Sequence, residues 1–372
     1  MNAAEVQRLC LKWNIPFYAY RLPGGKDVFW GAQLNGDVQP FREMSDVGEG
    51  RGFVMVPFRE TADCSALFIR SELSFVNESG DAGMANVLWR HRREAKAVDA
   101  PLPGVGQEEY YRQVADLIAA LKRQTVSKLV LSRNILVECD ALEMAPEWFA
   151  KLTEAYPEAF VFLVSVPGVT TWIGATPEVF LRQERGRAET MALAGTRSAG
   201  TKGAWGEKEI EEQQIVDRYV EEVLNGKGEW RKEGPFSKQA GQVEHLCTSF
   251  EHDGVLSFAQ IDRIRQELHP TPAVGGVPVR EAVELLEWTE RHRRRYYAGY
   301  LGPVGPGAEF HWFVNLRSME LFARQACLFV GGGITALSEP EKEWKETEMK
   351  SRTLLNVMVD GKGQTFLTLP ID

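Results

Sequence analysis

The order of strands and helices constrains the fold of this chain more than any other feature of its sequence. Short apolar stretches separated by turn residues predict strands in the first hundred residues, namely PFYAY, DVFWGAQL, FVMVPF and SALFIR. Longer strands and helices follow without regular alternation. Because parallel sheets need a crossover after each strand, this order predicts an α+β fold with large mixed or antiparallel sheets. No dinucleotide-binding or P-loop motif occurs between a strand and a helix.

A linker is expected at PLPGVGQ, residues 101–107, because it is rich in proline and glycine. Residues 1–100 contain no motif with recognisable chemistry, so we expect an N-terminal scaffold that is part of the same fold. Residues 101–372 are expected to form the domain that carries the functional site. That domain begins with an amphipathic helix, whose apolar stripe is Tyr110, Val114, Leu117, Ile118 and Leu121.

The composition narrows the class of partner. The 372 residues carry a formal net charge of -9, and their longest basic cluster is RHRRR, so a nucleic-acid partner is not expected. No apolar window has the length of a membrane span and the N-terminus lacks a signal-peptide pattern, which predicts a cytoplasmic protein with no membrane partner. The five cysteines are far apart and contain no CxxC pair, so neither a disulfide framework nor a zinc site is expected.

Two predicted helices carry glutamates at the same spacing. In SEPEKEWKETEMK, Glu343, Glu346 and Lys350 recur at i, i+3 and i+7 and share one helical face. A capping box of Ser338 and Glu341, with Pro340 in the first turn, is expected to begin this helix. Taken alone, such a charge run is usually a solvated face.

The second helix, EKEIEEQQIVDRYVEEVL at 207–224, repeats this spacing with Glu209 and Glu212. Its predicted inner face consists of Ile210, Val216, Tyr219, Val220 and Val223. Two glutamate pairs on facing helices could hold a hard divalent cation such as Mg²⁺, which prefers oxygen ligands.

Several other residue types suit an acid-base or anion site. Lys128 opens the apolar strand KLVLSRNILVE, either as a solvated end residue or as a desolvated amine that can act as a base. A turn at 174–177 places Glu178 at the start of the next strand. Gly195 and Thr196 offer an amide and a hydroxyl to a carboxylate. The strand LFVGGGI leaves backbone amides uncovered, and His245 is either structural or catalytic.

Three further segments have expected structures. Residues 225–240 are polar and glycine-rich, which predicts a loop. LHPTPAVGGVP, at 268–278, is expected to be a tight loop that forms a rigid pocket wall. A helix is expected over EAVELLEWTERHRRRYYAG, at 281–299.

The motifs, taken in order, resemble those of the chorismate-utilising enzymes, a family that includes isochorismate, salicylate, anthranilate and aminodeoxychorismate synthases. The resemblance runs from about Lys128 to Met358 and is carried by KLVLSR, GATPE, LAGTR, EIEEQQIV, HLCT, LHPTPAVGG, YYAGYLG, NLR, GGGI and EWKETEMK. One departure is GGGI, where many relatives have GAGI.

The resemblance implies a role for each matching residue. Glu212 and Glu346 would bind Mg²⁺ directly, with Glu209 and Glu343 holding the waters of the metal. Lys128 would be the general base that activates water and Glu178 the general acid. The two carboxylates of chorismate would be held by Gly195, Thr196, Tyr297, Arg317, Gly331, Gly333 and Lys350. His245 and Thr248 would line the ring, and the loop around Ala273 and Val274 would shape the choice of product.

Within this family the resemblance favours an isochorismate synthase, feeding menaquinone or siderophore biosynthesis. Ala194 stands where some members carry a covalent lysine, which disfavours that mechanism. Lys128 favours water over ammonia as the nucleophile, so no obligate glutaminase partner is expected. Salicylate synthase shares the water-adding residues and stays open as an alternative, and an ammonia-using synthase component is a more distant one.

Overall fold

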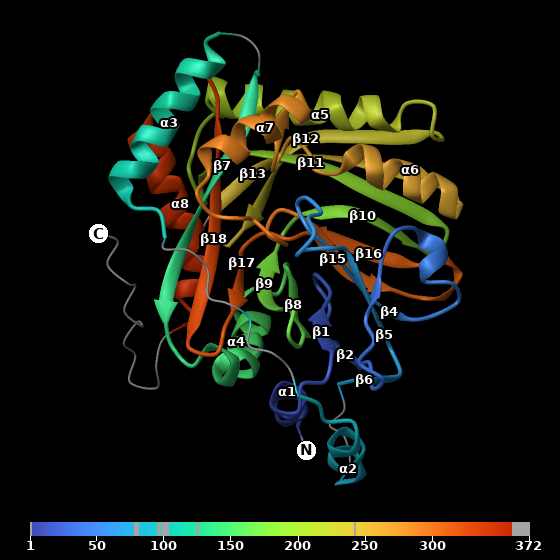
Figure 1. The fold of residues 1–372 in the computed structure, drawn as a ribbon. Helices are drawn as coiled ribbons and strands as arrows, with labels where there is room; N and C mark the ends of the chain where they lie inside the picture. The colour runs from blue at the N-terminus through green and yellow to red at the C-terminus, as the bar shows by residue number, and fades with distance from the viewer. Residues whose placement is uncertain are drawn as a thin grey trace.

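The computed structural model describes residues 2–77, 82–94, 98, 104–123, 126–241 and 243–358. Two nine-stranded sheets pack face to face (Figure 1). Every strand pair in both sheets is antiparallel, which confirms the predicted α+β class and excludes a mixed sheet among the described residues. Residues 101–103 of the expected linker lie outside the described residues.

The first sheet contains the strand with Lys128 and the glycine-rich strand. In spatial order its strands are β14 (Gly276–Val277), β7 (Lys128–Glu138), β18 (Gln325–Ile334), β17 (Ser318–Leu321), β9 (Thr170–Thr176), β8 (Phe160–Val166), β1 (Phe17–Arg21), β2 (Val28–Ala32) and β6 (Leu73–Val76).

The second sheet contains the strands that follow Glu178 and carry Gly195 and His245. Its spatial order is β12 (Trp230–Ala240), β13 (Val243–Asp253), β11 (Arg187–Ser198), β10 (Val179–Glu184), β16 (Phe310–Val314), β15 (Tyr300–Val304), β4 (Gly52–Val56), β5 (Leu67–Arg70) and β3 (Gln39–Pro40). The first hundred residues therefore supply three strands to the end of each sheet.

Helices cover the outer faces of this two-sheet core. Helices α1 (Ala3–Lys12) and α4 (Ala141–Ala155) pack on the first sheet, with α2 (Ala82–Arg90) beside α1, and α5 (Glu207–Leu224) and α6 (Phe258–Leu268) cover the second sheet. Helices α3 (Gln107–Leu121), α7 (Val279–Thr289) and α8 (Pro340–Leu355) surround the β7 and β18 end of the first sheet. Two short 3₁₀ helices, Met44–Asp46 and Pro306–Ala308, complete the elements.

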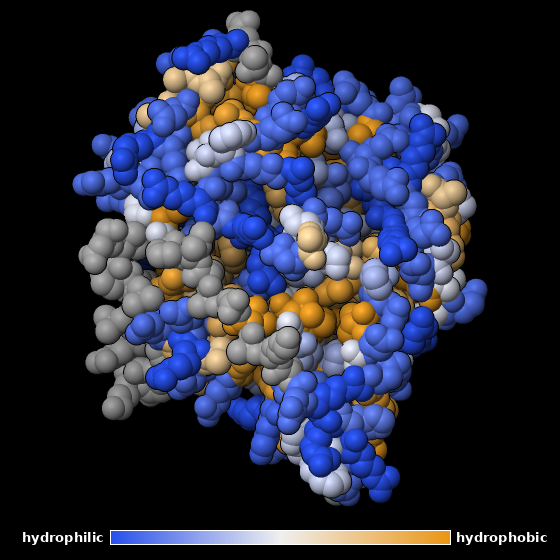
Figure 2. All heavy atoms as spheres, viewed as in Figure 1, coloured by the Kyte–Doolittle hydropathy of each residue, from blue (hydrophilic) through white to orange (hydrophobic). Residues whose placement is uncertain are grey.

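Aromatic side chains fill the space between the sheets. Phe160 of β8 and Phe313 of β16 stack with their ring centroids 4.1 Å apart, which joins the two sheets directly. Phe53 of β4 also stacks on Phe160, so strands from the N-terminal region share the same core. Outside this core the surface is mostly hydrophilic, with hydrophobic residues visible mainly in recesses (Figure 2). None of the described helices is long and apolar enough to cross a membrane.

Three local predictions were wrong. Residues 230–240 form β12, an edge strand whose side chains are mostly exposed. Its main chain pairs with β13. Because its side chains are mostly polar, the sequence has no hydrophobic alternation that would predict this strand. Helix α7 ends at Thr289, because Glu290 turns its backbone to an extended conformation and buries its carboxylate.

The third wrong prediction is the capping box of Ser338 and Glu341 at the start of α8, although the helix itself is confirmed. The N-cap residue is Glu339, without a side-chain cap, and Pro340 is the first helical residue. Ser338 Oγ instead accepts a hydrogen bond of 3.1 Å from the Thr335 amide, so it stabilises the turn that links β18 to α8.

We expect Phe160→Ala to lower the free energy of unfolding by about 3–5 kcal/mol, because it opens a cavity between the two sheets. Trp288→Ala is the matched control, since the Trp288 side chain is 90 % exposed and its truncation opens no cavity. Urea denaturation followed by circular dichroism measures both. Equal midpoints for the two variants would contradict the assignment of Phe160 to the centre of the core.

Candidate active site

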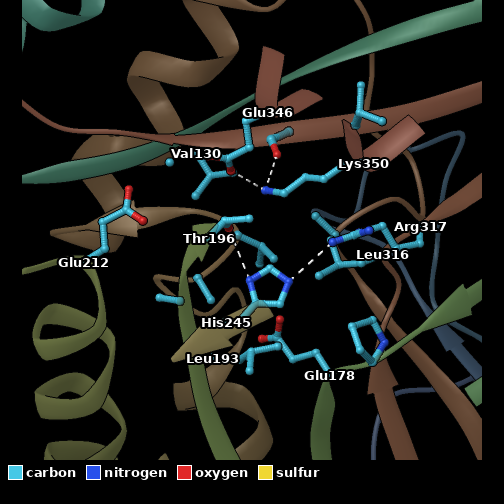
Figure 3. A pocket seen from close by; sticks show the side chains of 18 of the residues that line it. Val130, Glu178, Leu193, Thr196, Glu212, His245, Leu316, Arg317, Glu346 and Lys350 are labelled. Carbon is cyan, nitrogen blue, oxygen red and sulfur yellow. Dashed lines mark hydrogen bonds and ion pairs between the residues drawn. The ribbon is translucent and has the colours of Figure 1, made fainter. Parts of the chain in front are cut away.

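A pocket at the end of the two sheets gathers most of the predicted site residues. It is lined from the first sheet, the second sheet, helix α5 and helix α8, which lie far apart in sequence. The predicted residues that line it are Lys128, Glu178, Gly195, Thr196, Glu212, His245, Ala273, Tyr297, Arg317, Gly331, Gly333, Glu346 and Lys350. Figure 3 shows Glu346 and Lys350 above His245 in the view, Glu178 below it and Glu212 on a helix at one side.

Lys128 and Glu178 enter this pocket from different sheets. Lys128 is the first residue of β7 and is 2 % exposed, so it is not a solvated end residue. Burial lowers the pKa of its ammonium group, against the opposing effect of Glu212. Burial raises the pKa of the Glu178 carboxyl to about 8, against the opposing effect of Lys128. Both pKa values shift toward neutrality, as acid-base catalysis at neutral pH requires.

The glycines of β18 leave backbone groups free for a ligand. Gly331 and Gly333 lie opposite Ser132 and Val130 of β7. The carbonyl oxygens of Gly331 and Gly333 accept from Lys350 Nζ (2.8 Å) and from Ser338 Oγ (3.4 Å), so these residues direct their main-chain groups away from β7. In an antiparallel strand the N–H points the same way as the C=O of its residue. The amides of both glycines are therefore not used by the sheet.

His245 contacts both a β-bulge and Arg317. Gly195 has φ +66°, and the register of β11 on β13 shifts at this residue. The Gly195 carbonyl lies 3.0 Å from His245 Nδ1, so this nitrogen must carry the proton and donate. His245 Nε2 is then an acceptor for Arg317, 3.4 Å away. Burial lowers the pKa of His245 to about 3, so the imidazole is neutral and presents Arg317 to the pocket.

Three glutamates and two lysines form a cluster between α5 and α8. Lys208 Nζ donates to Glu343 Oε1 at 2.6 Å and lies 3.9 Å from Glu212 Oε1. Lys350 Nζ donates to Glu346 Oε1 at 2.6 Å. Burial raises the pKa of Glu212 and raises that of Glu343 to about 7. Against the effect of burial, Lys350 and Lys208 lower the pKa of Glu346.

The cluster fits a divalent cation. Glu212 Oε1 and Glu343 Oε2 are buried without a hydrogen-bond partner among the described residues, and such oxygen atoms are the ligands that Mg²⁺ prefers. Within the described part of the chain, no three acidic, histidine or cysteine side chains already meet in metal-ligand geometry. Glu343 and Glu346 are instead hydrogen-bonded to Lys208 and Lys350.

Some predicted residues lie outside the pocket. Thr248 is fully buried behind it, where its hydroxyl accepts from Gln213 Nε2 at 3.1 Å. The carboxylate of Glu209 turns back to the N-terminus of α5, beside Gly206. Glu343 does not line the pocket, and its carboxylate accepts a hydrogen bond from Lys208, which does not line the pocket either. On the same helix, Ile210 was predicted to face inward and is 40 % exposed.

Lys208 and Arg294 were missed by the sequence analysis. Lys208 stands four residues before Glu212 on α5, a spacing that predicts an ion pair and could have revealed it. Arg294 lies within the basic RHRRR cluster, where nothing in the pattern separates one buried arginine from its exposed neighbours. Its guanidinium donates to the Val130 and Val274 carbonyls and so fixes two walls of the pocket.

Comparison with known proteins places these features in a family. The model of the family described as "Chorismate binding enzyme" matches residues 89–359. The chain belongs to this family. The chorismate-binding enzyme is 30 % identical over 269 residues to isochorismate synthase EntC of Escherichia coli K12, an alignment that covers 68 % of this chain and 67 % of EntC.

Solved structures share the fold of this chorismate-binding enzyme. The structure of MenF, the menaquinone-specific isochorismate synthase of Escherichia coli, superposes with a TM-score of 0.77 at 17 % identity, covering 96 % of this chain and 91 % of MenF. Anthranilate synthase component I of Streptococcus pneumoniae superposes with a TM-score of 0.65 at 16 % identity, covering 91 % and 89 %. The fold is therefore common to enzymes that are named for different products.

We expect Glu178→Gln to raise the melting temperature relative to the wild type more at pH 9 than at pH 5. The folded pKa of Glu178 is about 8, above the usual value of 4.5, so the stability of the wild type falls as pH rises between these values. At pH 9 the wild type buries a charge that glutamine does not carry. Thermal unfolding at both pH values measures the difference, and an equal shift at pH 5 and pH 9 would contradict the burial of Glu178.

Proposed function

We propose that this chorismate-binding enzyme is a magnesium-dependent isochorismate synthase. The observation that carries the proposal is the pair of Lys128 and Glu178, which come from opposite sheets to one pocket with pKa values shifted toward neutrality. Such a pair can add water to one carbon of a ring while protonating a hydroxyl that leaves from another. The likeness to EntC supports the same product.

The reaction follows from the positions of these two groups. Neutral Lys128 takes a proton from water as the water oxygen forms a bond to C2 of chorismate. The ring double bonds shift, the C4–O bond breaks, and Glu178 gives its proton to the departing hydroxyl, which leaves as water. Lys128 ends protonated and Glu178 ionised, so a proton transfer back through solvent restores both groups.

The cations and free amides of the pocket suit a substrate with two carboxylates. Arg317, Lys350 and the Gly331 and Gly333 amides are positioned to bind carboxylate oxygens. Tyr297, whose hydroxyl lies against Gly331, can donate to the same group. Neutral His245 accepts a hydrogen bond from Arg317 and so orients it, which a protonated imidazole could not do.

The carboxylates of Glu212 and Glu346, supported by Glu343, would hold Mg²⁺. The metal would supply Lewis-acid stabilisation of the negative charge that spreads into the ring carboxylate. Glu209 would need another side-chain rotamer to take part, because its carboxylate now lies beside Gly206.

Incubation of the protein with chorismate and Mg²⁺, followed by chromatography, is expected to yield isochorismate without ammonia. Lys128→Ala and Glu178→Gln should each lower kcat by ~10²- to 10⁴-fold, the range for loss of a general base or acid. Lys122→Ala, an exposed lysine at the end of α3, is the control and should keep full activity. Salicylate with pyruvate as the main products would move the assignment to salicylate synthase. Turnover that requires ammonium, or activity that is unchanged when a chelator removes Mg²⁺, would contradict the proposal.

The glycines of β18 provide a separate test of the metal site. A Cβ on Gly333 would lie 2.4 Å from Glu212 Oε1, so Gly333→Ala must displace that carboxylate, whereas a Cβ on Gly332 would meet nothing closer than 3.4 Å. We expect Gly333→Ala to weaken Mg²⁺ binding by at least about tenfold, the order expected for displacing a charged ligand, and Gly332→Ala to leave it nearly unchanged. Calorimetric titration of each variant with Mg²⁺ measures this, and equal affinities would remove Glu212 from the metal site.

A further inference from the structure

The basic cluster Arg291–Arg295 lines a second cavity, which the proposed reaction does not use. This cavity has a volume of about 320 Å³ and lies between the segment that follows α7 and the loop from Phe58 to Cys64. Phe58 and Leu286 form apolar parts of its wall. Its volume falls in the range of small-molecule sites in proteins.

Positive charge predominates in the lining. Its arginines are Arg59, Arg291, Arg293, Arg294 and Arg295, against the carboxylates of Asp63, Glu287 and Glu290. Glu290 is already satisfied, because it accepts from the Ser132 amide at 2.7 Å and from Arg294 Nε at 2.8 Å. The other four arginines also have carboxylate partners: Arg59 and Arg293 pair with Glu287 and Asp63 of the lining, and Arg291 and Arg295 pair with Glu109 and Glu320 outside it.

The ion pairs at the mouth of this cavity are exchangeable. Arg59 pairs with Glu287, and Arg293 pairs with Asp63 at 2.6 Å. The two arginine side chains are 55 % and 75 % exposed. Exposed pairs of this kind contribute little to stability, so their arginines can turn to a ligand at small cost.

One donor in the lining has no acceptor. Arg295 Nε is buried without a hydrogen-bond partner among the residues that the structure describes, although the terminal nitrogen of Arg295 lies 3.3 Å from Glu320. An unpaired buried N–H is costly unless a ligand or water accepts from it. The terminal nitrogen also donates to the Val169 carbonyl at 2.8 Å, so the Arg295 guanidinium is held in place beside the cavity.

Arg294 belongs to both cavities. Its guanidinium lines this second cavity and the candidate active site, and it donates to the carbonyls of Val130 and Val274, which line the active site. The two cavities therefore share one fixed wall, but the exposed arginines Arg59 and Arg293 line only the second.

We propose that this second cavity binds a small anion with more than one carboxylate or phosphate group, held by Arg59 and Arg293 beside the fixed positive charge of Arg295. Arginine binds both kinds of oxyanion through paired N–H donors, and an anion with several charged groups can replace Glu287 and Asp63 at once. The site does not depend on the reaction assigned to the first pocket.

Calorimetric titration of the full chain with pyrophosphate, and separately with citrate, tests the proposal at constant ionic strength. We expect saturable binding of at least one probe, weakened at least about tenfold in Arg59→Gln/Arg293→Gln because two charge-assisted contacts are lost. The better probe identifies phosphate or carboxylate as the preferred group.

Two controls separate this site from others. Arg280→Gln removes an arginine of α7 that is 85 % exposed and paired with Glu284, and it should leave binding unchanged. Lys350→Gln alters the candidate active site and should also leave it unchanged. Absence of saturable binding at millimolar probe, binding that survives in the double variant, or binding lost in Lys350→Gln would each overturn the proposal.

Discussion

Burial of several carboxylates at one end of the molecule is the constraint on which the rest of the site depends. An isolated buried carboxylate loses hydration that the interior cannot replace, so it must be paired, protonated or bound to a metal. Lys208 and Lys350 supply part of the compensation. Burial raises the pKa of Glu343 to about 7, and a further cation beside this carboxylate would stabilise its charged form.

The two sheets determine from which side each charged group enters the pocket. Each sheet delivers one of the two groups proposed to transfer protons, so Lys128 and Glu178 need no shared strand or loop to line the same pocket. The helices bring carboxylates, and the glycine strand allows them to approach closely, because Gly333 has no side chain where Glu212 lies. The positions of these groups are set by the core far from the pocket, where Phe160 and Phe313 join the sheets.

The fold class and most of the pocket residues could be predicted from the sequence, because strand patterns, helix periodicity and an ordered set of motifs are local signals. Contacts that depend on the direction in which a side chain points could not be predicted from the sequence. Glu209 shares the spacing of Glu212 but turns back along its own helix, and Thr248 lies behind the pocket. Lys208 could have been found from its spacing with Glu212, but its pairing with Glu343, 135 residues away in sequence, has no local signal. The edge strand β12 lacks the apolar alternation on which strand prediction depends.

The first strands of the chain add three members to the end of each sheet, although the family match begins only at residue 89. Without them, β8 and β15 would become the sheet edges and present unpaired backbone groups beside exposed aromatic side chains. Such edges invite pairing with other molecules. The N-terminal strands therefore cover both edges, a role that depends on their backbone pairing more than on their exposed side chains.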